Sequence, residues 1–365
     1  MIVKNNYKEC LTNLACSIRK YFELDYNHDT LTYIDEILDK YKPNNVIVIL
    51  FDGMGSRILD RTLEKKSFFI KNKYKEITTV FPAATTAATT SIRTGLNPIE
   101  HGWLGWNTYI SPIDKTITLF KGTEKGFNVP CEEFENVKNK LITKTIVDEI
   151  NKKGEYSAIE LFPFGSDKYN DLDDMIKKIE NETKKPVKKY IYAYDDEPDY
   201  TMHDLGPNNS EVKNLIKERN DKIEKLCNKL TNSIVIVIAD HGHLKIDNIF
   251  LNDYPEIINM LERTTSIEQR AVSFKIKKEF YHSFKIEFNK LFEEYFDLYD
   301  REEIIESKIF GNGKPNDLFY DAIGDYIAIA KNDKCLLTDG DDELFSHHAG
   351  YTDDEIYVPL ILKLK

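Results

Sequence analysis

Cysteine is scarce in this sequence of 365 residues. Five cysteines are scattered along it and none forms a CxxC pair: Cys10, Cys16, Cys131, Cys227 and Cys335. Neither a disulfide framework nor a thiolate zinc site is expected, and a reducing compartment is the simpler interpretation. The first twenty residues carry interspersed charges and lack the uninterrupted apolar core of a signal peptide. We therefore expect a cytoplasmic protein.

Long hydrophobic runs are also absent. The longest apolar runs, such as residues 46–51, are far too short to cross a bilayer, so no membrane association is expected. The chain is poor in net positive charge as well, with a formal net charge of -12. Such an acidic chain should not hold duplex nucleic acid by general electrostatics. A small phosphorylated substrate stays compatible, because bound divalent metals invert the local charge.

Strand-like and helix-like patterns alternate along most of the chain. The β-branched runs 46–51 and 234–239 are typical of strands buried on both faces of a parallel sheet, and shorter candidates are 158–162 and 190–194. Helical patterns lie between them, at about residues 85–95, 142–153, 168–184 and 209–231. This alternation predicts a doubly wound, mostly parallel α/β sheet with helices on both faces.

Three segments do not follow the alternation. Residues 1–45 have helical apolar spacing and are interpreted as an N-terminal extension, before a catalytic domain at residues 46–365. Two insertions, at about residues 108–141 and 250–335, contain further strand-like and helix-like stretches. We interpret them as cap-like elaborations around the mouth of a site and not as an independent domain.

Carboxylates and histidines follow the predicted strands. Ligands collect beyond the carboxyl ends of strands in open α/β sheets, so these residues are expected to meet there. Each alone has an ordinary explanation as a helix cap, a turn or a solvated pair. Together they form a set of ligands suited to zinc or manganese. The set comprises Asp52, Asp199, His203, Asp240, His241 and either His347 or His348.

A small-residue segment, residues 80–96, contains several threonines. Its ordinary interpretation is a helix whose threonines cap its start. A helix start also presents free N–H groups to an anion, and a hydroxyl that touches a metal there loses its proton more easily. The segment is therefore a candidate for the nucleophile.

In the order and spacing of these motifs, the sequence resembles the alkaline phosphatase superfamily, and within it the type I phosphodiesterase/nucleotide pyrophosphatase family. The resemblance extends from about residue 45 to the end and implies an alkaline phosphatase-like fold. It implies two divalent metal ions, zinc or alternatively manganese. One would be held by Asp199, His203 and His348. The other would be held by Asp52, Asp240 and His241, with Thr85 also on it.

The same resemblance assigns the remaining roles. Thr85 lies nine residues before Thr94 of a Thr-Gly-Leu segment, as the family's nucleophile does, and the neighbouring Thr86 is the alternative. Asn107 would steady a phosphate oxygen, although it follows Gly102 by five residues where the family has four. The expected reaction is an in-line displacement through a threonyl-phosphate intermediate.

The substrate class is less specified. A dianionic monoester favours a guanidinium clamp, and only Arg57 and Arg93 lie near the motifs, which favours a diester or pyrophosphate bond. A nucleotide is one candidate substrate, and Trp103 and Trp106 could either stack on its base or serve as packing residues. The alternatives are a phosphomonoesterase, a metal-dependent phosphomutase, a phosphonate hydrolase, or a catalytically silent metal-stabilised scaffold.

Overall fold

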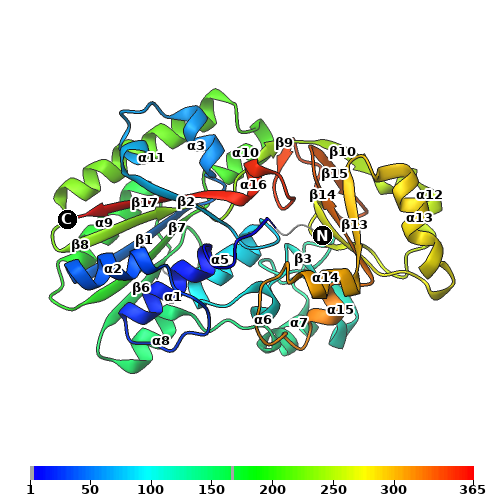
Figure 1. Cartoon of the computed structure of the whole chain (residues 1–365), viewed down its shortest axis with the longest axis horizontal. Helices are drawn as coiled ribbons and strands as arrows, with labels where there is room; N and C mark the ends of the chain where they lie inside the picture. Colours follow the sequence, from blue (N-terminus) through cyan, green and yellow to red (C-terminus); the bar gives the residue numbers. More distant parts are fainter. Residues whose placement is uncertain (1–3, 166–167) are drawn as a thin grey trace.

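The computed structural model describes residues 4–165 and 168–365 of the chain. Its larger half is built on a six-stranded sheet with the order β2-β17-β8-β1-β7-β6 (Figure 1). The strands are β1 (Asn45–Phe51), β2 (Lys73–Thr78), β6 (Ser157–Leu161), β7 (Lys189–Asp195), β8 (Ser233–Ile238) and β17 (Tyr357–Leu364). β1 pairs in parallel with both β7 and β8, and β7 with β6, whereas β17 is antiparallel to its two neighbours.

Helices cover both faces of this sheet (Figure 1). On one face lie α1 (Leu11–Tyr21), α2 (Thr32–Tyr41), α5 (Thr85–Thr94) and α8 (Ile146–Lys153). On the other lie α3 (Ser56–Thr62), α4 (Phe68–Asn72), α9 (Leu172–Thr183) and α11 (Ser210–Lys229). β1 is buried along its whole length because both of its faces are covered. The arrangement confirms the predicted doubly wound, mostly parallel α/β class.

Two strands of this sheet were not anticipated from the sequence. β2 is an edge strand with several exposed residues, so it has no continuous apolar run. β17 contains Pro359, which lacks a backbone donor and reads as a strand breaker. The proline lies in the part of β17 that pairs only with β2, where a missing donor disrupts one neighbour and not two.

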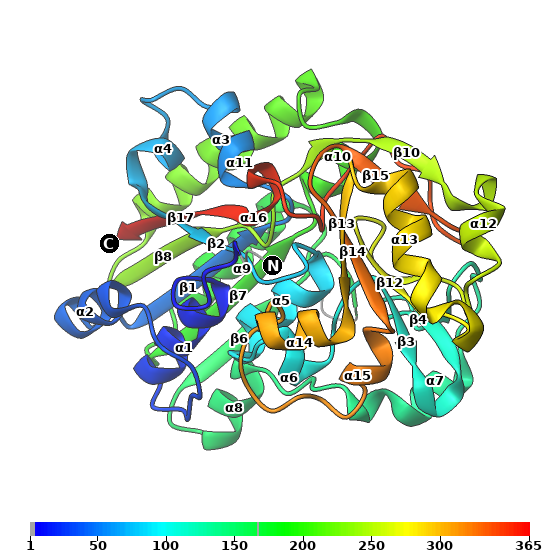
Figure 2. The same ribbon diagram turned by 45° about the vertical axis from the view of Figure 1, so that its right-hand side comes forward.

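The two insertions combine in a second, seven-stranded sheet with the order β13-β14-β12-β11-β3-β4-β5 (Figure 2). The first supplies β3 (Asn107–Ile110), β4 (Lys115–Thr118) and β5 (Thr123–Glu124). The second supplies β11 (Ser266–Ile267), β12 (Ala271–Phe274), β13 (Phe296–Asp300) and β14 (Tyr326–Ala330). They meet where Ile267 pairs with Asn107. Both are therefore parts of one layer.

Shorter elements complete the fold. The remaining helices are α6 (Pro98–His101), α7 (Glu132–Val137), α10 (Asp199–Leu205), α12 (Pro255–Ile258), α13 (Tyr281–Phe292), α14 (Arg301–Ser307), α15 (Phe319–Ala322) and α16 (Asp353–Ile356). Single 3-10 turns are η1 (Ser111–Ile113), η2 (Lys138–Lys140), η3 (Leu251–Asp253) and η4 (Lys278–Phe280). The remaining strands are β9 (Leu244–Lys245), β10 (Asp247–Phe250), β15 (Lys334–Leu337) and β16 (Ser346–His347).

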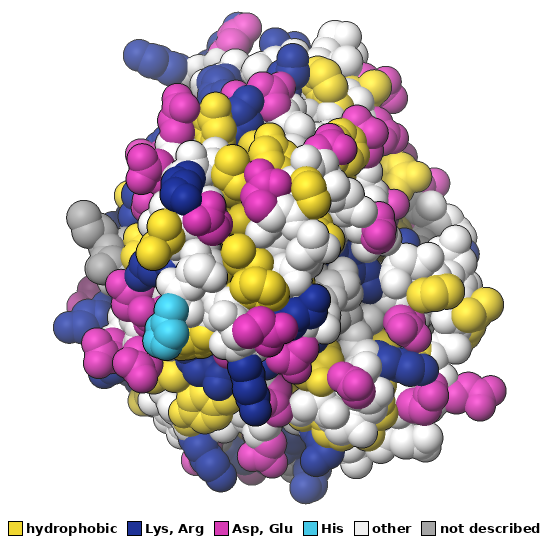
Figure 3. All heavy atoms as spheres, turned by 90° about the vertical axis from the view of Figure 1, so that its right-hand side faces the viewer, with side chains coloured by type: hydrophobic (Ala, Val, Ile, Leu, Met, Phe, Trp, Pro, Cys, Tyr) yellow, Lys and Arg dark blue, Asp and Glu magenta, His cyan; other side chains and the backbone are white. Residues whose placement is uncertain are grey.

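The apolar core is divided between the two sheets. Side chains of α1 and α2, such as Leu14 and Leu38, belong to the same buried cluster as β1, so the N-terminal helices are packed into the main core. A separate apolar cluster lies between the second sheet and α13. It includes Phe284 and Phe288 of α13. Within the described residues, none of the helices is both long and apolar enough to cross a membrane. On the face shown in Figure 3, acidic and basic side chains are interspersed.

Candidate metal centre and nucleophile

Three of the predicted site segments lie at the same edge of the main sheet. Asp52 directly follows β1, and Asp240 and His241 follow β8 one residue after its end. Asp199 is the first residue of α10, which comes shortly after β7. Because β1, β7 and β8 are parallel neighbours, their carboxyl ends bring these side chains together.

Asp52 is buried between charged and polar neighbours. Its Oδ1 lies 3.2 Å from Nε2 of His241, and the Tyr194 hydroxyl donates a hydrogen bond to its Oδ2. Burial, followed by the nearby Asp199 carboxylate, raises the pKa of Asp52 well above its usual value. Burial and the neighbouring Asp52 carboxylate likewise raise the pKa of Asp240. These two carboxylates are costly to keep charged without a nearby cation.

Asp199 and His203 lie one helical turn apart in α10. The Oδ2 of Asp199 is 3.0 Å from Nε2 of His203, as the four-residue spacing allows. Burial alone would lower the pKa of His203, but the Asp199 carboxylate raises it to about 9. Gly53 makes room for this pair, since it adopts φ +69 and a Cβ there would lie 2.9 Å from the Asp199 side chain.

A short antiparallel ladder brings two further histidines to the cluster. β9 pairs with β16 through Leu244 and His347, so the residues at the end of this ladder, His243 and His348, come close to Asp199. The Nε2 of His348 is 4.0 Å from Asp199 Oδ1, and that of His243 is 3.2 Å from the same oxygen. The structure thus brings His348 and not His347 to the carboxylates, and it adds His243, which the sequence analysis missed.

Each of the four histidines has its Nδ1 bonded to a fixed partner. The Nδ1 of His203 is hydrogen-bonded to Ser346 O at 3.0 Å and that of His241 to Gly242 O at 3.0 Å. The Nδ1 of His243 is hydrogen-bonded to Ser346 Oγ at 2.6 Å and that of His348 to Ala83 O at 2.9 Å. A backbone carbonyl can only accept, so in His203, His241 and His348 the proton sits on Nδ1. Their Nε2 atoms then face the carboxylates, where a bound metal ion would take the place of any proton on Nε2. This is how histidines that bind a metal are oriented.

The donor atoms form two groups that fit divalent cations. In one, Asp199, His203, His243 and His348 each offer an atom, and these atoms lie within 4.8 Å of one another; in the other, Asp52, Asp199 and His241 do so. Asp199 Oδ1, Asp240 Oδ2 and His243 Nε2 are buried without a hydrogen-bond partner. Buried carboxylate and imidazole atoms left unpaired are expensive, and a bound cation would satisfy them. Both groups could therefore hold a metal ion.

Thr85 is the first residue of α5 and lies against the second group. Its Oγ1 is 3.1 Å from His241 Nε2 and 3.5 Å from Asp52 Oδ1. The hydroxyl of Thr86 is buried without a hydrogen-bond partner. Of the two threonines weighed from the sequence, the structure places Thr85 at the carboxylates and imidazoles.

The comparison with protein families agrees with this geometry. The model of the family described as type I phosphodiesterase / nucleotide pyrophosphatase matches residues 46–351. The chain belongs to this family. It is therefore a hydrolase of the phosphodiesterase and pyrophosphatase type. No curated protein matches the sequence.

Solved structures of the same fold include members of this family. Murine ectonucleotide pyrophosphatase/phosphodiesterase 5, solved as an inactive threonine-to-alanine variant in complex with AMP, matches with a TM-score of 0.65 and 20% identity. The match covers 86% of this chain and 87% of that chain. The human protein matches over the same shares with a TM-score of 0.65 and 18% identity. The phosphodiesterase-family chain thus has an alkaline phosphatase-like fold.

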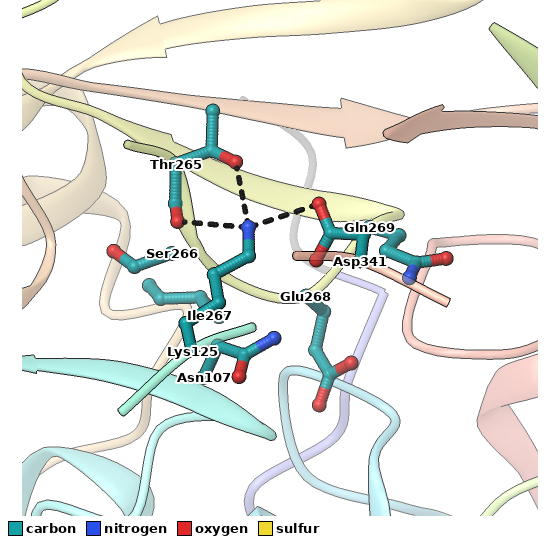
Figure 4. Close-up of a pocket in the computed structure, with 8 residues that line it drawn as sticks. All are labelled: Asn107, Lys125, Thr265, Ser266, Ile267, Glu268, Gln269 and Asp341. Carbon is teal, nitrogen blue, oxygen red and sulfur yellow. Dashed lines mark hydrogen bonds and ion pairs between the residues drawn. The ribbon is translucent and has the colours of Figure 1, made fainter. Parts of the chain in front are cut away.

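Asn107 of this phosphodiesterase-family protein lines a pocket between the two insertions (Figure 4). Its Oδ1 accepts a hydrogen bond from the Thr118 hydroxyl at 2.7 Å, which leaves the amide nitrogen available as a donor. Glu268 faces the same pocket, and its Oε1 accepts from the Trp106 amide at 2.6 Å. Burial raises the pKa of Glu268 to about 8, and His241 and His203 interact with it electrostatically.

The remaining charge in this pocket is neutralised. Lys125 is almost fully buried and lies 2.9 Å from the carboxylate of Asp341, which is equally buried. Its ammonium also donates to both oxygens of Thr265 (Figure 4) and to the Thr338 hydroxyl. Lys125 is thus held between the two insertions by partners of its own and does not offer a free positive charge to a ligand.

Neither arginine near the motifs is free to bind a phosphate. Arg93 forms a two-pronged ion pair with Glu160, with distances of 2.8 and 2.7 Å. Arg57 is paired with Glu76. Both guanidinium groups therefore already have carboxylate partners.

The two tryptophans have different surroundings. The indole of Trp103 donates to Ile142 O at 3.0 Å and packs against the apolar cluster of the first insertion, so it is a packing residue. Trp106 is half-buried and meets the exposed Phe120 ring edge-on, with centroids 6.0 Å apart. Trp106 is connected to the pocket through its backbone amide, which donates a hydrogen bond to Glu268.

Proposed function

We propose that this chain hydrolyses phosphodiester or pyrophosphate bonds through a threonyl-phosphate intermediate formed on Thr85, in which phosphorus keeps the part of the substrate that does not leave. The observation that carries the proposal is the position of the Thr85 hydroxyl. It lies at the start of α5, within 3.1 Å of His241 and 3.5 Å of Asp52. The first amides of a helix have no acceptor within it, so this end of α5 favours an anion.

Two divalent ions, zinc or manganese, would occupy the donor groups around the threonine. Asp199, His203 and His348 would hold one, and Asp52, Asp240 and His241 would hold the other. When bound, such ions neutralise phosphate oxygens and lower the pKa of a neighbouring hydroxyl. The unpaired buried oxygens of Asp199 and Asp240 support both assignments.

The residues of the chain then have separate tasks. Thr85 Oγ attacks phosphorus in line with the leaving group, whose bond to phosphorus breaks, while the hydroxyl proton passes to solvent. Water then attacks the phosphorus of this threonyl-phosphate ester, which still carries the second ester group, and releases Thr85, so two inversions give net retention at phosphorus. Asn107 would donate to a phosphate oxygen, since Thr118 occupies its carbonyl end.

Charge in the site favours a diester over a monoester. A monoester carries a second negative charge, which the paired Arg57 and Arg93 cannot compensate. The Glu268 carboxyl beside Asn107 adds a further acidic group. A bound divalent cation nearby would promote its ionisation, and an ionised carboxylate repels the extra charge of a monoester.

A nucleotide is the substrate class we propose. Murine ectonucleotide pyrophosphatase/phosphodiesterase 5 was solved with AMP, and its fold covers 86% of this chain. We also propose a cytoplasmic location, because all five cysteines are free and buried.

The proposal is tested with purified protein loaded with zinc or manganese. Bis(p-nitrophenyl) phosphate and the p-nitrophenyl ester of thymidine 5'-phosphate should be hydrolysed faster than p-nitrophenyl phosphate. Acid quenching during turnover of the thymidine ester, followed by peptide mass spectrometry, should find a thymidine 5'-phosphoryl group on Thr85. A faster monoester reaction would refute the diester preference, and the same adduct on another residue would refute the nucleophile.

A further inference from the structure

His243 is a buried histidine that the family's metal pattern does not use. It lies two residues after His241 in the segment Asp240-His241-Gly242-His243 and has no exposed surface. We propose that His243 is a direct ligand of the metal ion held by Asp199, His203 and His348, so that this ion has four protein ligands. The inference rests on the metal centre of the proposed function and deepens it.

The spacing of the donor atoms suits a single ion. In a tetrahedral zinc site, with bonds of ~2.0–2.1 Å, neighbouring donor atoms are ~3.3 Å apart. His243 Nε2 lies 3.2 Å from Asp199 Oδ1, and His203 Nε2 lies 3.0 Å from Asp199 Oδ2. His348 Nε2 is somewhat farther, at 4.0 Å from Asp199 Oδ1. The Asp199 carboxylate is therefore close to all three histidines, and one small cation could bind Asp199 and the three Nε2 atoms together.

The three imidazole rings surround the carboxylate without stacking on one another. The rings of His203 and His243 have centroids 4.7 Å apart and an interplanar angle of 73°. Those of His243 and His348 are 5.4 Å apart at 66°. Rings turned this way do not cover one another, and one donor atom from each of the four residues lies within 4.8 Å of the others.

Ser346 determines which nitrogen of His243 carries the proton. The Ser346 hydroxyl donates its only hydrogen to Met202 O at 2.9 Å. Its oxygen can then only accept from His243 Nδ1, which lies 2.6 Å away, so the proton of the imidazole is on Nδ1. Nε2 is left with a bare lone pair. The backbone carbonyl of the same Ser346 orients His203 in the same way.

A plain core histidine does not account for this arrangement. If His243 simply hydrogen-bonded to Asp199, its Nε2 would carry a proton and donate it. Nε2 and Asp199 Oδ1 are instead both buried without a hydrogen-bond partner, although they are 3.2 Å apart. Two facing lone pairs repel each other, and a cation between them turns the repulsion into two bonds.

A fourth protein ligand separates the roles of the two ions. A zinc ion with four protein ligands is closed, whereas one with three keeps a position for water or substrate. The group around Asp199 would then retain its ion more firmly. The group next to Thr85 would be the more open of the two.

The experiment compares His243→Asn with a matched control, His347→Asn. Asparagine can keep a hydrogen bond to Ser346 but is too short to reach the ion. His347 is a neighbouring buried histidine outside both donor groups, and its Nδ1 accepts from the His348 amide. Zinc stoichiometry and Kd are measured by competition with a chromophoric chelator, with circular dichroism to verify folding.

We expect wild type to bind two zinc ions. His243→Asn should raise the Kd of one zinc ion by about a hundredfold or more. His347→Asn should leave both Kd values near those of wild type. Unchanged Kd values in His243→Asn would overturn the inference. Wild type that binds fewer than two ions would instead contradict the proposed two-metal function itself.

A second measurement keeps the test decisive if His243→Asn folds poorly. Wild-type protein labelled with nitrogen-15 histidine and loaded with cadmium-113 gives a coupling between the two nuclei at each imidazole nitrogen that binds the metal. Nε2 of His243 should show this coupling, as should Nε2 of His203 and His348. A protein that binds two cadmium ions without coupling at His243 would also refute direct ligation.

Discussion

The hydroxyl oxygen of Thr85 lies 3.1 Å from Nε2 of His241, although 156 residues separate the two in sequence. The contact joins the start of α5 to the end of β8, and Asp52 at the end of β1 lies within 3.5 Å of the same hydroxyl. This contact is the basis for the proposal that Thr85 is the residue that attacks a phosphate.

Replacement of Thr85 is expected to abolish turnover. Thr85→Ala removes the nucleophile, so kcat for bis(p-nitrophenyl) phosphate should fall by about a thousandfold or more. Zinc content should stay at the wild-type value, because the carboxylates and imidazoles remain. Thr86→Ala is the control, and a Thr86→Ala protein that loses activity while Thr85→Ala keeps it would reassign the nucleophile.

Metal removal should both inactivate and destabilise the protein. Dialysis against a chelator leaves Asp52, Asp199 and Asp240 close together without a cation, so activity should be lost. Zinc at a free concentration of about a hundred times its Kd should restore it and stabilise the fold by about 2.7 kcal/mol per site. Thermal unfolding with increasing zinc measures this, and a Tm independent of zinc would contradict the assignment.

Asp240→Asn should change how the stability of the metal-free protein depends on pH. Burial and Asp52 raise the pKa of Asp240, so the folded protein holds a proton that the unfolded chain releases. The stability that this bound proton contributes is fully present below the pKa of Asp240 in the unfolded chain. It is lost as the pH rises through the pKa of Asp240 in the folded protein. The variant should therefore be more stable than wild type at about pH 8 and similar at about pH 4.

Urea unfolding of the two metal-free proteins measures this difference. The asparagine oxygen can still accept from the Gly53 and His241 amides, each 3.0 Å from Oδ1, so the local backbone should be preserved. With saturating zinc the order should reverse, because wild type supplies a charged ligand. A pH-independent difference between the two would show that Asp240 does not titrate with folding.

Glu268→Gln should relax the preference for diesters. The glutamine oxygen can keep the bond to the Trp106 amide, which is 2.6 Å long in the wild type, while the negative charge is removed. The ratio of kcat/KM for p-nitrophenyl phosphate to that for bis(p-nitrophenyl) phosphate should rise by about tenfold. Equal losses for both substrates would indicate that Glu268 only supports the backbone.

The pair of Arg270 and Glu355 should be essential for stability. Both side chains have no exposed surface, their closest atoms are 2.8 Å apart, and Glu355 also accepts from the Gly350 amide just after His348. Arg270→Met leaves a buried carboxylate without its partner and should cost about 3–5 kcal/mol in chemical denaturation. The double variant with Glu355→Gln should recover part of that loss, and no recovery would argue against unpaired charge as the cause.

Much of the fold could be predicted because its signals are local. The β-branched runs that became β1 and β8, and the amphipathic stretches that became α8, α9 and α11, each show their period within a few residues. The candidate ligands Asp52, Asp199, His203, Asp240 and His241 could be proposed from the sequence because each lies close to such an element. The second sheet was not, because β11 and β3 meet at a single residue pair from distant segments.

Residue type and spacing along the sequence by themselves determined the chemistry available to this protein: hard and borderline ligands after buried strands, and a threonine-rich helix start. Only the tertiary structure decided which neighbours share that chemistry. It places Thr85 and His348, and not Thr86 and His347, beside the carboxylates, and it brings His243 next to Asp199 through the pairing of β9 with β16. The physical reason is that ligand sets depend on distances of a few ångströms between strand ends. Such distances are set by sheet order and ladder register, which no local pattern encodes.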